Sequence, residues 1–111
     1  MKIVNLQDVL SVKPAHGNYL KKVMIDNGEI PHIFAFAQVT LVPGVKTEPH
    51  GHDGRYEIFL VEQGKAKLIY NGKDEYVAEK GACIITDPSE THEVSNPFDE
   101  DLVMTYFQVE V

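Results

Sequence analysis

The sequence predicts an all-β domain, either a sandwich or a barrel, and two observations support that prediction. Runs rich in β-branched and aromatic residues recur along the chain, and each is bounded by residues that favour turns. These runs recur about every eight to twelve residues without helical periodicity between them, which is typical of all-β folds. The chain of 111 residues is expected to form one domain, residues 1–111, large enough to bury a core.

Seven segments are expected to be strands. In chain order they are 19–25, 32–42, 56–61, 66–70, 75–77, 82–86 and 102–109. Between the fourth and fifth lies Asn71-Gly72, a pair that favours a two-residue type I′ hairpin because both positions need a positive φ. Helical character is confined to residues 6–10, where a single turn is expected.

Several of the expected strands are apolar on both faces. Residues 56–61 carry large apolar side chains at almost every position, and residues 33–37 and 103–107 resemble them. In a small antiparallel sheet one face usually meets water. One face is therefore expected to line the interior and the other to pack on a second sheet or on a partner subunit, which favours a homodimer. The alternative is that the N-terminal segment covers the outer face.

Charge and cysteine content limit the partners and the compartment. The net charge is −7, and the ten basic residues are dispersed among seventeen acidic ones, which argues against nucleic acid and anionic membranes as partners. No apolar stretch is long enough to span a bilayer, and the first residues do not resemble a signal peptide. Cys83 is the only cysteine, so a reducing cytoplasm is the expected compartment, with Cys83 as a buried, inert thiol.

Two histidines one residue apart, His50 and His52, are followed by Glu57. Side chains at positions i and i+2 of an extended segment point to the same face, so the two imidazoles aim at one point. Asp53-Gly54 is a turn signal that can fold the next strand back beside the first and bring Glu57 to the histidines. A further histidine on a strand edge, His92, is placed to complete a transition-metal site.

The segment from Gly44 to Gly64 resembles the first of two motifs that characterise the cupin superfamily. That motif is a glycine, five residues, His-x-His, three or four residues, a glutamate, six residues and a glycine. This sequence meets every fixed position, with His50, His52 and Glu57 in the polar places.

Residues 81–96 resemble the second cupin motif in a degraded form. Gly81 opens it, and the spacing from His92 to the final asparagine is intact. Six residues rather than five separate Gly81 from Pro88, and Ser89 stands where the motif usually has glycine. His92 is retained as the expected ligand, while the geometry of the turn before it stays open.

The resemblance implies a jelly-roll-like barrel, the cupin double-stranded β-helix, with a metal inside its wide end. The implied ligands are His50, His52, Glu57 and His92. Three imidazoles and one carboxylate suit one divalent transition metal (Fe, Mn, Co, Ni, Cu or Zn) and leave positions open for water or substrate. Because ligand histidines must be neutral, metal affinity should fall as the pH drops toward about 6.

Each implied ligand also has a simpler interpretation. His50 and His52 could be a surface pair near a glycine-rich turn, and His92 could be a loop histidine. Glu57 is more telling, because a carboxylate in an apolar run is costly to bury without a partner.

Other residues offer weaker hypotheses. Arg55 and Tyr56 flank the implied carboxylate and could face a substrate, although solvent or core would also suit them. Gln38 could point into the barrel as a donor to a ligand, or be a satisfied core amide. His16 and His32 are expected at the surface. Five aromatic residues are expected in the core or the pocket wall: Phe34, Phe36, Phe59, Tyr106 and Phe107.

Three functions are compatible with the resemblance. The first is a metal-dependent enzyme acting on a small organic molecule, a dioxygenase before an isomerase or lyase, with Glu57 as ligand and, if it detaches, as catalytic base. Thiol dioxygenases of the superfamily usually lack the motif glutamate, so that subclass is disfavoured. The second is a non-catalytic module that binds or senses a small ligand. The third is a structural metal site with a closed coordination shell.

Overall fold

The computed structural model describes residues 1–14 and 17–111, and these residues form eight strands and one short 3-10 helix. The helix, η1 (Leu6–Asp8), lies within the segment where a helical turn is predicted. The strands are β1 (Leu20–Ile25), β2 (Ile33–Leu41), β3 (Arg55–Gln63), β4 (Lys65–Tyr70), β5 (Asp74–Glu79), β6 (Cys83–Thr86), β7 (His92–Ser95) and β8 (Leu102–Glu110). The all-β prediction is confirmed. The described residues contain no helix with the length and apolar character needed to cross a bilayer.

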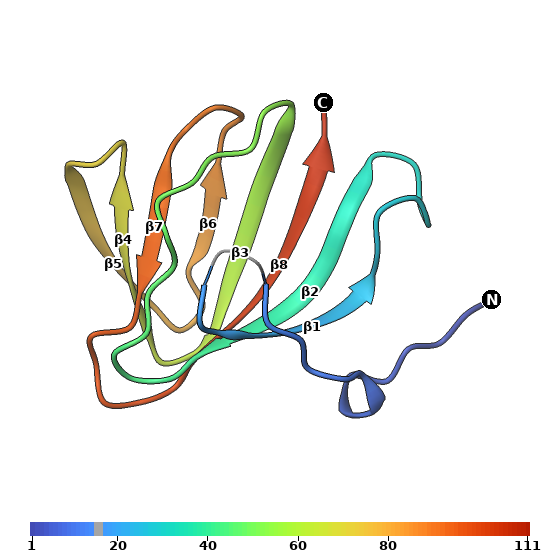
Figure 1. Ribbon diagram of the computed structural model, residues 1–111, viewed down its shortest axis with the longest axis horizontal. Coiled ribbons are helices and arrows are strands. Elements are labelled where there is room, and N and C mark those ends of the chain that lie inside the picture. The colour runs from blue at the N-terminus through green and yellow to red at the C-terminus, as the bar shows by residue number, and fades with distance from the viewer. Residues whose placement is uncertain (15–16) are drawn as a thin grey trace.

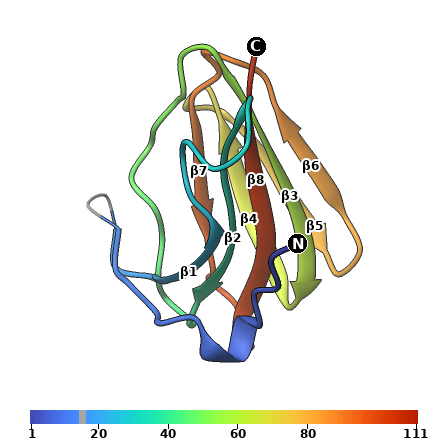
Figure 2. The same cartoon turned by 90° about the vertical axis from the view of Figure 1, so that its right-hand side faces the viewer.

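The strands form two antiparallel sheets (Figures 1 and 2). The larger sheet has five strands in the order β1-β2-β8-β3-β6, and the smaller has three in the order β5-β4-β7. The C-terminal strand β8 lies inside the larger sheet, hydrogen-bonded to both β2 and β3. Strands that are neighbours in the sheet are therefore distant in the sequence, as in a jelly roll.

The core lies between the two sheets. Alternate residues of β2, β3 and β8 are buried, as the two-residue period of a strand requires. The smaller sheet contributes Ala66, Leu68 and Val94 to the same cluster. Each fully buried large aliphatic side chain stabilises the fold by about 1.5–3 kcal/mol. The apolar core therefore joins the two sheets without help from any bound group.

All seven predicted strands are present, with ends that differ from the prediction by no more than two residues. In the predicted hairpin, Asn71 and Gly72 have φ values of 50° and 76°, so both positions are left-handed as expected. The N–H of Lys73 donates to the carbonyl of Tyr70 at 3.0 Å, which closes the turn. Strand β7 is not among the seven predicted segments, because its four residues include only one aliphatic side chain, although His92 is expected at a strand edge.

We call residues 46–52, which carry His50 and His52, the histidine segment. The chain beyond Asp53-Gly54 does not fold back beside this segment, so that prediction is wrong. Lys46 and His50 form bridges to residues of β7, which belongs to the smaller sheet. Strand β3 instead pairs with β6 and β8 in the larger sheet. The histidine segment and β3 therefore lie on opposite sides of the interior, and Glu57 reaches the histidines across it.

The outer face of the larger sheet carries exposed apolar side chains. Tyr56, Leu60 and Ile85 are 38%, 43% and 60% exposed. The N-terminal segment lies elsewhere, at the end of β1 and β2, where Lys2 forms an ion pair with Glu29 at 2.6 Å. It therefore leaves the outer face over β3 and β6 open to solvent.

Cys83 lies on this outer face and is exposed, so the prediction of a buried thiol is wrong. Strand β6 alternates exposed and buried residues, and its buried positions are Ile84 and Thr86. An apolar run on an edge strand does not bury both of its faces, and Cys83 falls on the outer one.

Candidate metal centre

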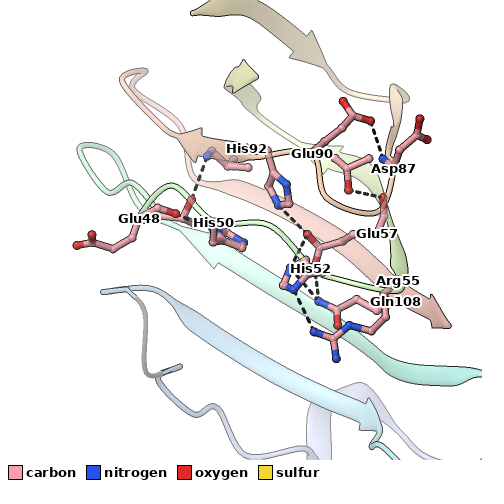
Figure 3. A network of polar contacts seen from close by, with 12 residues as sticks. Glu48, His50, His52, Arg55, Glu57, Asp87, Glu90, His92 and Gln108 are labelled. Atoms are coloured by element: carbon pink, nitrogen blue, oxygen red, sulfur yellow. Dashed lines mark hydrogen bonds and ion pairs between the residues drawn. The ribbon is translucent and has the colours of Figure 1, made fainter. Parts of the chain in front are cut away.

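Three separate stretches of chain bring His50, His52, Glu57 and His92 together inside the barrel (Figure 3). One potential ligand atom from each of the four lies within 4.8 Å of the others. The ring centroids of His50 and His92 are 4.4 Å apart, and those of His50 and His52 are 5.1 Å apart. The four residues chosen from the sequence are thus close enough to share one ion.

Backbone hydrogen bonds fix His50 against His92. The N–H of His50 donates to the carbonyl of His92 at 3.0 Å, and the N–H of His92 donates back at 2.8 Å. Gly51 lets the backbone between the two histidines approach the backbone that precedes His92, because a Cβ at position 51 would lie 2.9 Å from the carbonyl oxygen of Glu90. Glycine is therefore required between the two histidines for steric reasons.

Glu57 and His92 are the buried half of the cluster, 3% and 2% exposed. Glu57 Oε1 lies 2.8 Å from His92 Nε2 and 3.4 Å from His52 Nε2. Neither Glu57 Oε1 nor His92 Nε2 has a hydrogen-bond partner among the described residues, so their close approach lacks hydrogen-bond alignment. Leaving a buried polar group unpaired costs about 1–3 kcal/mol, and a shared cation would satisfy both atoms.

Gln108 on β8 holds the other oxygen of Glu57. Its Nε2 donates to Glu57 Oε2 at 2.5 Å and lies 3.4 Å from His52 Nε2. Gln108 is 7% exposed and shares the inward face of β8 with Met104 and Tyr106. This contact directs Glu57 Oε1 toward the histidines. Gln108 is not among the site residues predicted from the sequence. Its position two residues after Tyr106 and four after Met104 nevertheless places it on the same face of the strand as these two core residues.

Gln38, for which the sequence offers the same supporting role, lies on the outer face of β2. Its Nε2 donates to Glu62 Oε2 at 3.2 Å, and the same oxygen accepts a hydrogen bond from Thr105 at 2.7 Å. Ala37 and Val39 take the neighbouring inward positions. Strand parity therefore places Gln38 outside the site and outside the core.

Arg55 packs behind His52. Its Cζ lies 3.7 Å from the centre of the Phe34 ring, and its Nη2 lies 3.2 Å from His52 Nδ1. A guanidinium only donates, so His52 Nδ1 accepts in this contact and the proton of the neutral ring sits on Nε2. Metal binding through Nε2 would require this proton to move to Nδ1 and Arg55 to turn away. Arg55 thus faces a candidate ligand rather than solvent.

The protonation states of Glu57 and His50 suit a metal site. Burial raises the pKa of Glu57, but contacts with His52 and His92 outweigh it and hold that pKa well below its usual range. Burial also lowers the pKa of His50, which favours the neutral ring. The Nδ1–H of His50 donates to the carbonyl of Glu48 at 2.7 Å, which leaves Nε2 available. A metal needs ligands in these deprotonated forms.

The turn before His92 contains a strained residue at the position where the second motif departs from the cupin pattern. Ser89 has a φ of 73°, in the left-handed region that costs a residue with a Cβ about 1–2 kcal/mol. The N–H of Asp87 donates to the Glu90 carboxylate at 2.8 Å, and the N–H of Glu90 donates to the Asp87 carbonyl at 3.2 Å. Ser89 thus adopts the conformation for which glycine is suited, and His92 still reaches the site.

A cavity of about 140 Å³ opens beside the cluster. Of the five aromatic residues singled out in the sequence, Phe59 and Tyr106 line it. Phe36 and Phe107 instead pack edge to face, with ring centroids 6.3 Å apart, at positions other than the cavity wall. Outside the candidate ligands, the described polar side chains of the wall are Tyr19, Lys21, Thr47, Tyr106 and Gln108.

Three other residues considered from the sequence lie away from the site or outside its description. His32 is exposed, as predicted. Tyr56 is exposed on the outer face of β3. His16 lies outside the described residues.

A jelly-roll barrel with three histidines and a glutamate gathered beside an interior cavity defines a class of small β-barrel proteins with a potential metal site. Residues 37–108 match the family described as the cupin domain, and the chain belongs to this family. A curated relative, the oxalate-binding protein of Thermotoga maritima, is 34% identical over 67 residues. The match covers 60% of this chain and 54% of that protein, so it spans about half of the relative's length.

Solved structures share the fold. A predicted oxalate decarboxylase from Thermotoga maritima has a TM-score of 0.90 at 20% identity, covering 99% of this chain and 100% of that chain. A cupin 2 conserved barrel domain protein from Salinispora arenicola has a TM-score of 0.78 at 24% identity, covering 100% and 90%. A cupin-like protein from Thermotoga maritima has a TM-score of 0.75 at 27% identity, covering 86% and 71%. The jelly-roll prediction is thereby confirmed.

Proposed function

We propose that this protein is a metal-dependent cupin that acts on a small organic molecule. One divalent transition metal would be held by His50, His52, Glu57 and His92. The observation that carries the proposal is that buried Glu57 Oε1 and His92 Nε2 lie 2.8 Å apart, while neither atom has a hydrogen-bond partner among the described residues. A cation is the partner that such a pair lacks, and the donor set suits Fe, Mn, Co, Ni, Cu or Zn.

A metal bound there would supply Lewis acidity at coordination positions that the four protein ligands leave open. The chain's own residues do the rest. The cavity wall, which includes Leu41, Phe59 and Met104, excludes bulk water from the ligand. Glu57 faces both the histidines and the cavity, so it would serve as a metal ligand and, if detached, as the base that takes up a proton.

The reaction class proposed first is oxygen-dependent oxidation of the dioxygenase type, with isomerisation or lyase chemistry next. Each of these reactions needs a metal with open positions and a small cavity shielded from water. The presence of Glu57 in the first motif continues to argue against a thiol dioxygenase.

A non-catalytic ligand-binding module is the second candidate. A relative that is 34% identical over 67 residues is named as an oxalate-binding protein, which favours a small carboxylate as the ligand. Among the described residues that line the cavity, no carboxylate or histidine lies outside the candidate ligand set. A protein that binds its ligand without turnover needs no such additional acid or base.

Metal content tests the site common to both candidates. We expect natively purified protein to hold one transition-metal ion per chain, and His52→Ala to lose it while the β fold stays intact, because the core is apolar. His32→Asn is the matched control, since His32 is exposed and asparagine tolerates its φ of 70°. Wild-type metal content in the His52→Ala protein, by elemental analysis, would show that the ligand assignment is wrong.

Turnover separates the two candidates. Metal-loaded protein is assayed for oxygen uptake with aromatic, diketone and thiol compounds, and for consumption of oxalate. Product formation that His52→Ala abolishes supports the enzyme. Binding of oxalate by calorimetry without product supports the module.

We also propose that two copies associate through the outer face of the larger sheet. The exposed side chains of Tyr56, Leu60 and Ile85 give this face the apolar character of an interface centre. Ile85→Glu should shift the protein from dimer to monomer in analytical ultracentrifugation. Tyr76→Glu is the control on the smaller sheet, where Tyr76 is 58% exposed. A monomeric wild-type protein would refute this association.

A further inference from the structure

Lys21 on β1 faces the cavity beside the candidate metal site. In the pairing of β1 with β2 it lies opposite Val39, which is buried and also lines the cavity. Residues directly opposite each other in antiparallel strands project to the same face. Lys21 is therefore an inward-facing cation on a face that is otherwise mostly apolar.

What sets Lys21 apart from the other lysines is its place in the cavity wall, since no other lysine lines this cavity among the described residues. Lys2, Lys65 and Lys67 each form an ion pair with a glutamate, at distances between 2.6 and 3.6 Å. Among residues 1–14 and 17–111, none forms an ion pair with Lys21, although the whole chain has a net charge of −7. An anionic ligand in the cavity would supply a counter-ion for Lys21.

The other polar groups still available in the wall are mainly donors. Burial raises the pKa values of Tyr19 and Tyr106, so both hydroxyls stay protonated at neutral pH. Thr47 already accepts a hydrogen bond from the N–H of Val94 at 3.0 Å. Gln108 is engaged with a candidate ligand. The cavity therefore suits a molecule rich in acceptor oxygens.

We propose that Lys21 is the anion-recognition residue of this site, and that the ligand is a small dicarboxylate held between the metal position and Lys21. This inference rests on the proposed metal site. A divalent cation, Glu57 and Lys21 together leave a positive cavity within an acidic protein, which favours an anion. The volume of about 140 Å³ restricts that anion to a few heavy atoms. Tyr19 and Tyr106 would donate to its oxygens.

Calorimetric titration of the metal-loaded full chain tests this assignment. Malonate is the anionic probe, and malonamide is a neutral probe of similar shape. The variants are Lys21→Met, which removes the charge, Lys21→Arg, which keeps it, and Lys22→Met as the matched control. Lys22 is the next residue of β1, and its ammonium lies 3.4 Å from the carbonyl oxygen of Leu6 rather than in the cavity.

Lys21→Met should weaken malonate binding by about tenfold or more, because a hydrogen bond to a charged group is lost. Malonamide affinity should stay unchanged, Lys21→Arg should retain most of the malonate affinity, and Lys22→Met should bind malonate like the wild type. Thermal unfolding by circular dichroism confirms that each variant is folded.

Two results would overturn the role of Lys21. One is malonate affinity that is unchanged by Lys21→Met or equally reduced by Lys22→Met. The other is a metal-loaded wild-type protein that binds none of oxalate, malonate and succinate. Elemental analysis of the same samples separates these failures from failure of the proposed function, since a wild type that takes up no metal refutes the metal site itself.

Discussion

The two faces of the larger sheet carry the same pair of chemical groups in different surroundings. On the inner face the Gln108 amide donates to the Glu57 carboxylate, and both side chains are buried. On the outer face the Gln38 amide donates to the Glu62 carboxylate at 3.2 Å, in contact with solvent. An exposed polar contact is weak because water competes for it, whereas a buried one is strong and costly to break. The comparison teaches that strand parity, rather than residue type, decides which glutamate can serve a metal.

The largest difference between the two faces is expected from replacing the carboxylates. Glu57→Gln should lower metal affinity by at least about 100-fold, because an amide supplies no anionic oxygen. This loss should exceed the loss of affinity caused by removing a residue that only orients a ligand. Glu62→Gln on the same strand should leave metal affinity unchanged. Competition with a chelator measures both affinities. Equal metal affinities of the two variants would show that the inward-facing glutamate has no special role in metal binding.

Replacing the amides should give the next largest effect. Gln108→Leu should weaken metal binding by about 10–100-fold, because the Glu57 carboxylate loses the donor that orients it. Gln38→Leu should leave metal affinity unchanged, since its contact with Glu62 is on the outer face. The same chelator competition applies, and a Gln108→Leu protein with wild-type affinity would show that Glu57 needs no such support.

The pH dependence of the stability of the metal-free protein also distinguishes the buried groups of the inner face from groups on the surface. Burial lowers the pKa of His50, so the unfolded chain takes up a proton near the ordinary pKa of about 6.5 while the folded ring does not. The pKa of Glu57 is also lowered, so the unfolded chain gains a second proton near about 4.3. The free energy of unfolding should therefore decrease as the pH falls below about 6.5, and again below about 4.3.

Urea denaturation of the metal-free protein at several pH values measures this decrease. His50→Gln should remove the first fall, whereas His32→Asn at the surface should keep it. A wild-type stability that is constant between pH 7.5 and about 5.5 would contradict the expected direction.

The smallest effect is expected in the turn that leads to the inner face. Ser89→Gly should raise the free energy of unfolding by less than about 1 kcal/mol, since relief of the left-handed strain is partly offset by the flexibility of glycine in the unfolded chain. Ser95→Gly in β7 is the control and should lower it. The urea midpoints report both changes, and a destabilised Ser89→Gly protein would show that the serine side chain is needed in this turn.

The strand pattern and three of the four candidate ligands could be predicted because they depend on local spacing, and His92 could be predicted from the resemblance of residues 81–96 to the second cupin motif. The His50-Gly51-His52 spacing and the lone carboxylate of Glu57 in an apolar run are visible in the sequence, and the structure brings them to His92. Gln38 alternates with the inward-facing Ala37 and Val39, so the same two-residue period places it outside the interior.

Other features depend on contacts between distant segments. Gln108 reaches Glu57 from a strand more than fifty positions away in the sequence. The pairing of the histidine segment with β7 cannot be read from local turn signals, since Asp53-Gly54 is compatible with reversal inside one sheet or across to the other. These contacts follow from topology, which local patterns do not determine.

Glu57 belongs to the larger sheet, whereas His92 belongs to the smaller one and comes 35 positions later in the chain. An ion shared by the two would clamp the halves of the barrel and stabilise the folded chain by about 2.7 kcal/mol at a free concentration one hundred times its dissociation constant. Chains synthesised during metal shortage would open more often and be degraded sooner by proteases. The abundance of this protein in the cell would then follow the supply of its metal, independently of any control of its synthesis.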